Sequence, residues 1–225
     1  GGRALYWPRG KVVGGSSSMN AMVWTTGHPA DYDQWAAQGN PGWAWADVQP
    51  RLERLPVARG AQRSPNPLSR AFVASASRAL GVPAGTPDGP TGPVAGLVQV
   101  TQHRGARASA AHAYLRNAPK SLEVRTNFHV TRLTVHERRV TGLEVAAPDG
   151  TRQVLAARRG VILSAGAVST PQLLLLSGIG PGVDVRALGL PVVTDLPGVG
   201  RNLQDHLACG IGWECRRPVS LPGTP

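Results

Sequence analysis

Apolar residues in the first half of the chain recur at helical spacing in a few short segments, which are separated by stretches rich in glycine and proline. A spacing of three or four between apolar positions predicts an amphipathic helix. This spacing predicts helices at residues 31–37, 43–52, 68–80 and 109–115. Gly81 follows the third predicted helix, where glycine commonly closes a helix, and Ser109 can cap the fourth. The weakly apolar segments 56–67 and 81–96 are predicted to be loops.

From residue 122 the apolar pattern changes from helical to alternating. Alternation between apolar and polar positions is typical of β-strands. It predicts strands at residues 122–126, 129–135, 140–145 and 151–155. Pro148-Asp149-Gly150 predicts a turn before the last of these, so the strands are expected to form an antiparallel meander. Shorter strands are expected at residues 97–101, 192–195 and 210–215.

Residues 161–165 differ, because they are almost continuously apolar, which is typical of a strand buried on both faces. Small residues follow, and then Pro171, which favours the first position of a helix. With Ser169 or Thr170 as its cap, a helix is predicted at residues 172–177. A strand, a turn of small residues and a helix N-terminus make up a nucleotide-binding βα unit. The GxGxxG fingerprint of such units is absent. The whole pattern predicts a mixed α/β fold.

The composition adds a strong positive charge, because 24 Lys and Arg residues outnumber 13 Asp and Glu residues, for a formal net charge of +11. Such a charge is compatible with nucleic acid or an anionic membrane as a partner. The arginines are scattered, however, and do not interleave with aromatic residues as they do in an RNA-binding module. We therefore interpret the charge as a solvated basic surface and expect no nucleic-acid partner.

The cysteines and the apolar runs exclude two further classes of site. The two cysteines, Cys209 and Cys215, form no CxxC motif and no Cys/His set, so the sequence predicts no metal site. No apolar run is long enough to span a bilayer as a helix, and the start of the chain shows no signal-peptide pattern. We expect a cytoplasmic protein without a transmembrane segment.

Residues 10–20, GKVVGGSSSMN, carry the most specific chemistry of the chain. The glycine pair Gly14-Gly15 lets the backbone approach another group closely or adopt a positive φ. Three serine hydroxyls and the amide of Asn20 follow. Glycines beside hydroxyls and free backbone N–H groups suit a phosphate or the polar edge of a ring. A plain Gly/Ser-rich surface loop has the same local pattern, so these residues alone leave both interpretations open.

The same stretch resembles a signature of the glucose–methanol–choline (GMC) oxidoreductases, flavoenzymes that oxidise alcohols. The positions that carry the resemblance are Gly10, Lys11, Gly14, Gly15, Ser16, Ser17, Met19, Asn20, Trp24, Gly27 and Asp33. A second signature of the family is similar to Gly166, Ala167, Thr170, Pro171, Leu173, Leu174 and residues 177–180. The resemblance covers nearly the whole chain. It implies that residues 1–40 and 120–205 are part of an FAD-binding, doubly wound sheet domain with a β-meander, and that residues 41–118 and 206–225 are part of a substrate domain.

The resemblance also implies a site for FAD. Its residues in this chain are Gly14, Gly15, Ser16, Asn20, Ala21, Met22, Val23 and Val130. The glycines would allow a close approach of the backbone, and the backbone of Val130 would meet the adenine. From its residue type alone, Val130 would be a core valine. Some relatives attach the flavin through a histidine at the position of Met19. A thioether cannot form that bond, so we expect FAD to bind non-covalently.

The chemistry implied by the family is hydride transfer from a small-molecule alcohol to flavin N5, while a histidine takes the hydroxyl proton. None of the six histidines of this chain matches that position, so no catalytic residue is assigned. The chain resembles the middle of a longer flavoenzyme, and alone it is expected not to oxidise alcohols. Two other classes remain as alternatives. One is a non-catalytic remnant that binds a nucleotide or a partner chain, and the other is a basic nucleic-acid-binding domain, whose affinity would fall steeply with salt.

Overall fold

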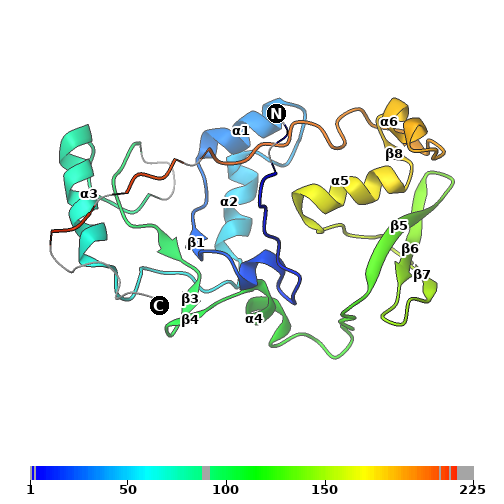
Figure 1. Cartoon of the computed structure of the whole chain (residues 1–225), viewed down its shortest axis with the longest axis horizontal. Helices are drawn as coiled ribbons and strands as arrows, with labels where there is room; N and C mark the ends of the chain where they lie inside the picture. The colour runs from blue at the N-terminus through cyan, green and yellow to red at the C-terminus, as the bar shows by residue number, and fades with distance from the viewer. Residues whose placement is uncertain (1, 3, 88–91, 208, 213, 217–225) are drawn as a thin grey trace. The chain divides into compact units, whose positions relative to one another are not determined.

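The computed structural model describes residues 2, 4–87, 92–207, 209–212 and 214–216 (Figure 1). The chain divides into two compact units. Unit 1 consists of Gly1–Leu122 with Trp213–Pro225, and unit 2 consists of Glu123–Gly212. Each unit contains both helices and strands, so the mixed α/β class predicted from the sequence is confirmed.

The helices of unit 1 lie where the apolar spacing predicts them. They are α1 (Pro29–Ala37), α2 (Trp45–Glu53), α3 (Pro67–Leu80) and α4 (Ala110–Leu115). Three of them are capped by a side chain that accepts a hydrogen bond from the first turn: His28 caps α1 at 3.1 Å, Asn66 caps α3 at 2.8 Å and Ser109 caps α4 at 3.3 Å. Gly81 closes α3 with a φ of +64°. These helices were predictable because their start and stop signals are local.

Aromatic side chains pack α1 against α2. The ring of Tyr32 lies 5.3 Å from those of Trp35 and Trp45, and Trp35 lies 5.8 Å from Trp43, distances typical of aromatic pairs. The carboxylate of Asp33 accepts a hydrogen bond from Trp45 N at 2.9 Å, so α1 also caps the start of α2.

Short strands connect distant parts of unit 1. One antiparallel pair is β1 (Val23–Trp24) with β2 (Gln99–Val100), and another is β3 (Gln102–His103) with β4 (Ala106–Arg107). β2 is shorter than the strand predicted at residues 97–101. On its other side, Val100 exchanges backbone hydrogen bonds with Gly60 at 2.9 and 3.1 Å. The side chains of Val100 and Ala108 are buried, so the core of unit 1 lies around this ladder.

Unit 2 is built around an antiparallel sheet, as the alternation predicts. Its strands are β5 (His129–His136), β6 (Arg139–Ala146) and β7 (Arg152–Ala156), in the order β5-β6-β7. The remaining elements are α5 (Gly166–Leu176), β8 (Ile179–Gly180), α6 (Gly182–Ala187) and β9 (Thr194–Asp195), and β8 pairs with β9 in parallel. The predicted meander is confirmed, and β9 is shorter than the strand expected at 192–195.

Helix α5 packs on β5 (Figure 1), and the buried Ser177 at the end of α5 links the two. The hydroxyl of Ser177 donates to Leu173 O at 2.5 Å and accepts from Leu133 N at 2.8 Å. Leu133 and Leu173 are themselves buried, as is Val145 of β6. The core of unit 2 therefore includes one hydroxyl that satisfies a backbone donor which the sheet leaves unpaired.

Three predicted strands are wrong for the described residues. Residues 122–126, 161–165 and the described part of 210–215 have no strand structure. After the first of these segments, Asn127 takes a φ of +62°, which interrupts an extended chain. Ile162 is 92% exposed, so the described residues provide no neighbour for the second segment. An apolar run becomes a strand only beside a partner strand, which local sequence cannot supply.

Helix α5 begins earlier than its proline predicts. Its first residue is Gly166, and Pro171 lies inside the helix, not at its first position. The hydroxyl of Thr170 accepts a hydrogen bond from Ala165 N at 3.1 Å, so Thr170 satisfies a donor at the start of the helix from within it. Pro171 is the sixth of the eleven residues of α5, so it removes one backbone hydrogen bond from the middle of the helix, which nevertheless continues to Leu176.

Candidate functional site

Residues 10–20 fold into a compact turn within unit 1. Gly15 N donates to Val12 O at 2.8 Å, and the one-turn 3₁₀ helix Gly15–Ser18 follows. The backbone N–H of Asn20 closes the turn on Ser16 O at 2.9 Å. Gly10 N donates to the hydroxyl of Ser16 at 3.2 Å, which joins the two ends of the turn. This segment is therefore a defined structure and not an irregular surface loop.

Two glycines of this turn occupy places that no side chain can share. A Cβ at Gly10 would lie 2.6 Å from Ser16 N. A Cβ at Gly14, where φ is +93°, would lie 2.5 Å from the Ser18 hydroxyl and 3.0 Å from the Cβ of Ala111 in α4. Gly15 has a φ of +56°, and a Cβ there would meet nothing within 4 Å. Packing requires glycine at positions 10 and 14, whereas backbone conformation favours it at 15.

The serine hydroxyls hold the turn to itself and to α4. Ser17 donates to Gly14 O at 2.5 Å and accepts from Ala110 N at 2.9 Å, so it links the turn to the first residue of α4. Ser18 donates to Val13 O at 3.0 Å. Ser16 acts as an acceptor, which leaves its O–H proton available to a ligand. Of the three serines, Ser16 alone was selected from the sequence as a cofactor contact, and these structural roles of Ser17 and Ser18 were missed.

Asn20 is held by an arginine that sequence reasoning did not select. The Asn20 Oδ1 atom accepts hydrogen bonds from Met22 N at 3.1 Å and from Arg107 Nη1 at 2.9 Å. The same Nη1 atom donates to Ser17 O at 3.2 Å. Arg107 lies in β4, far from the turn in sequence, and it is one of many arginines. No local signal distinguished it.

The residues after Asn20 lead into strand β1. Met22 has a φ of +61°, and its carbonyl accepts from Thr101 N at 2.8 Å. Val23 pairs with Val100 across the β1–β2 ladder. The indole N–H of Trp24 is buried and has no hydrogen-bond partner among the described residues, while the guanidinium of Arg59 lies 4.9 Å from its ring. The ladder thus fixes the backbone from Met22 to Trp24.

Val130 belongs to unit 2, at the start of β5. It pairs with Val145 of β6, and the register shifts between Val130 and Arg132. The side chain of Val130 is half-buried. The structure thus brings Gly14, Gly15, Ser16, Asn20, Ala21, Met22 and Val23 together in unit 1. Val130, the remaining proposed contact, lies in unit 2.

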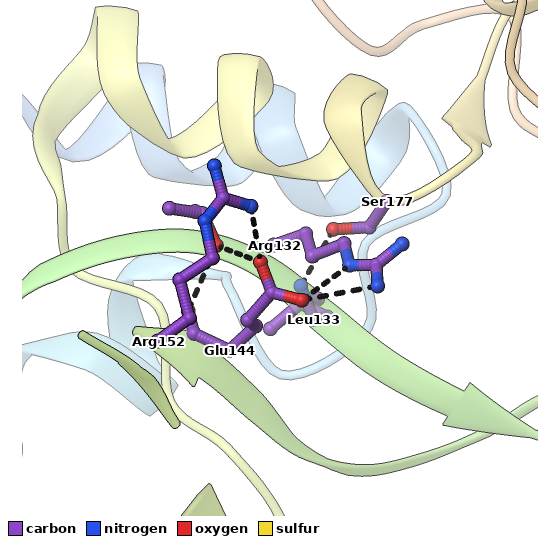
Figure 2. Close-up of polar contacts among 6 residues, drawn as sticks. Arg132, Leu133, Glu144, Arg152 and Ser177 are labelled. Carbon is purple, nitrogen blue, oxygen red and sulfur yellow. Dashed lines mark hydrogen bonds and ion pairs between the residues drawn. The ribbon is translucent and has the colours of Figure 1, made fainter. Parts of the chain in front are cut away.

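Beside Val130, a carboxylate ties the three strands of the meander together (Figure 2). Glu144 of β6 accepts from the Thr131 hydroxyl at 2.8 Å and pairs with Arg132 and Arg152, each at 3.0 Å. The hydrogen bond from Thr131 and the two guanidinium charges hold the pKa of Glu144 below its ordinary value. All the donors around Glu144 face this one carboxylate, so we assign the cluster a structural role.

Other kinds of site find no support in the part of the chain that the structure describes. Within it, no three His, Cys, Asp or Glu side chains gather where they could hold a metal ion. None of the described helices is long and apolar enough to cross a membrane.

Unit 2 has a pocket of about 290 Å³ between β5, the end of α5 and residues 190–193, and its walls are mostly apolar.

The comparisons with known proteins identify the family. The family described as GMC oxidoreductase matches residues 1–208 of the chain. The chain belongs to the GMC oxidoreductase family. The resemblance stated from the two sequence signatures is therefore confirmed.

Individual GMC relatives agree with this assignment. An oxygen-dependent choline dehydrogenase of Brucella canis is 41% identical over 237 residues, which cover 98% of this chain and 43% of the relative. The solved structure of a pyridoxine 4-oxidase from Mesorbium loti matches with a TM-score of 0.79 at 32% identity, covering 91% of this chain and 44% of that chain. An FAD-dependent oxidoreductase from Chaetomium thermophilum matches with a TM-score of 0.77 at 29% identity, covering 88% of this chain and 39% of that chain. The chain spans less than half the length of these relatives.

Proposed function

We propose that this chain supplies part of the FAD site of an enzyme that oxidises the CH–OH group of a small alcohol. The observation that carries the proposal is the turn at residues 10–20. Gly10 and Gly14 are packed against the turn's own atoms, Gly15 holds a positive φ, and the turn ends on an amide whose oxygen is already occupied. Together with the family assignment, this turn favours a cofactor-binding role over a plain surface loop.

The residues of the turn have the chemistry that FAD requires. We propose Gly14, Gly15, Ser16, Asn20, Ala21, Met22, Val23 and Val130 as its contacts. The O–H of Ser16 and the N–H groups of the Asn20 amide are the donors for the polar edge of the flavin. The backbone of Val130 would meet the adenine. When bound, FAD would supply the hydride acceptor for the oxidation of the alcohol carbon to a carbonyl, with the hydroxyl proton passing to a base for which this chain offers no assigned residue.

Two further parts of the proposal concern attachment and organisation. Met19 stands where some relatives carry the histidine that bonds to the flavin, so we propose non-covalent FAD. We also propose that residues 1–40 and 120–205 belong to the cofactor domain, and that 41–118 and 206–225 belong to the substrate domain. A cytoplasmic location remains a prediction, to be tested by cell fractionation.

The test is flavin binding and reduction in the whole protein, meaning this chain together with any sequence that flanks it. We expect the purified protein to be yellow, to release its FAD into the supernatant after acid precipitation, and to bleach anaerobically with an alcohol. Choline is the first alcohol to try, because one relative is named a choline dehydrogenase. The Asn20→Ala variant should retain less flavin or reduce it more slowly, since it lacks the proposed donor.

The outcomes separate the alternatives. A protein that binds FAD or ADP but is not bleached by any of a panel of primary alcohols would support the non-catalytic remnant. A colourless protein that binds neither would refute the proposal. Equal flavin content and equal turnover in wild type and Asn20→Ala would remove Asn20 from the site. Binding to DNA or RNA that weakens steeply with added salt would support the nucleic-acid alternative.

A further inference from the structure

The two hydrogen bonds to Asn20 Oδ1 fix which way its amide points. Both donors, Met22 N and Arg107 Nη1, face the same atom of the carboxamide. A flipped amide would place its NH2 group against two N–H donors and lose both hydrogen bonds. One of these is charge-assisted and therefore strong. The oxygen must stay on the side of Arg107, so the NH2 group projects away from it.

The position of Arg107 is itself well determined. Arg107 pairs with Gln102 across the β3–β4 ladder, and the backbone N–H of the next residue, Ala108, donates to Thr101 O at 2.9 Å. Ala108 is buried, with 3% of its surface exposed. A single nitrogen, Nη1, bridges Asn20 Oδ1 and Ser17 O. The arginine is thus anchored through its backbone on one side and holds the turn on the other.

The guanidinium of Arg107 is directed at the turn of residues 10–20. Arg107 is half-buried, and none of the described acidic side chains forms an ion pair with it. Among the described residues, its guanidinium donates to the backbone carbonyl of Ser17 and to the amide oxygen of Asn20. A cation on that oxygen polarises the amide and strengthens its N–H groups as donors.

We infer that Arg107 is a positioning residue for the flavin: it orients and polarises the Asn20 amide so that its N–H groups donate to the polar edge of the ring. This inference rests on the proposed function. A donor fixed before the reaction stabilises the negative charge that develops on a ring as it accepts a hydride. Arg107 acts through Asn20 and needs no contact with the alcohol.

The test compares bound flavin in four forms of the whole protein: wild type, Arg107→Met, Arg107→Lys and Asn20→Ala. We expect Arg107→Met to lower the rate of flavin reduction at saturating alcohol about ten-fold, with KM nearly unchanged. It should also shift the flavin midpoint potential to a more negative value and change the visible spectrum, as Asn20→Ala does. Arg107→Lys keeps the charge but cannot make the bridge, so it should fall between wild type and Arg107→Met.

Two comparisons make the test specific. Arg104→Met removes an exposed arginine from the turn between β3 and β4 and should leave the potential and spectrum unchanged. The double variant Arg107→Met/Asn20→Ala should match Asn20→Ala alone, because Arg107 acts through that amide. Additive effects on the reduction rate would overturn the inference.

Other outcomes are equally decisive. If Arg107→Met lowers stability or flavin content while the remaining bound flavin keeps its wild-type potential and spectrum, Arg107 is only structural. If Arg107→Met does not fold, the comparison of Arg107→Lys with wild type decides, and an unshifted potential there refutes the inference. A wild-type protein that binds no flavin would refute the proposed function itself, and this inference with it.

Discussion

Replacing Gly14 with alanine tests whether the turn at residues 10–20 is packed as the structure shows. The new Cβ would lie 2.5 Å from the Ser18 hydroxyl and 3.0 Å from the Cβ of Ala111, both closer than ordinary van der Waals contact. The residue would also keep a φ of +93°, which L-residues rarely adopt. The perturbation therefore combines backbone strain with overpacking.

The expected loss in the free energy of unfolding is the sum of these two costs, and a substitution at Gly15 provides the matched control. A left-handed conformation costs a non-glycine residue about 1–2 kcal/mol. Forcing an extra methyl into a packed site costs about 1–3 kcal/mol, for a total of about 2–5 kcal/mol. Gly15→Ala has the first term only, since φ is +56° and nothing lies within 4 Å of a Cβ. We expect Gly14→Ala to destabilise the protein by about 1–3 kcal/mol more than Gly15→Ala.

Urea denaturation of the whole protein, followed by circular dichroism, measures this difference as the change in the free energy of unfolding. Adding Ser18→Ala to Gly14→Ala should recover part of the loss, because it removes the nearest atom. If the two glycine variants are destabilised equally, within about 0.5 kcal/mol, the turn does not pack against Ser18 and α4 as described.

Two further predictions concern unit 2. Ser177→Ala should destabilise the protein by about 1–3 kcal/mol in the same urea assay, because it leaves the Leu133 N–H buried without an acceptor, whereas exposed Ser169→Ala should have little effect. Glu144→Gln should make stability less sensitive to acid. Because the pKa of Glu144 in the folded protein is below its ordinary value of 4.5, its stabilising contribution is present above that pH and is lost as the pH falls through the folded pKa. If Glu144→Gln differs from wild type in unfolding free energy by the same amount at neutral pH as at acidic pH, where Glu144 is protonated, this role is contradicted.

The elements that the sequence predicted well are those whose signals are local. The cap at Asn66 and the glycine at position 81 mark both ends of α3 without reference to any other part of the chain. The meander was predictable for a similar reason, since short turns join its strands. The strand predicted at 161–165 failed, because a strand also needs a neighbour, and the described residues supply none.

In the candidate site, too, the residues with a local sequence signal were predicted and those that depend on distant contacts were not. Its motif residues were found from their resemblance to a family signature, and the residues that support them were not. Arg107 reaches Asn20 across 87 positions in sequence, and Glu144 reaches Thr131 across 13. Arginine is common in this chain, so nothing in the sequence distinguishes Arg107, and no motif around Glu144 points to Thr131. Only the folded structure shows that Arg107 meets the motif and that Glu144 meets Thr131.

The shape of the motif therefore depends on a second segment. Residues 107–111 contact the turn in three independent ways: Arg107 bonds to Asn20 and Ser17, Ala110 N donates to Ser17, and Ala111 packs beside Gly14. Each contact constrains a different atom of the turn, so a change at any one leaves the other two in place. The amide of Asn20 alone depends on a single side chain from that segment. This is why Arg107 is the position where a substitution should alter the proposed flavin contact while the turn stays folded.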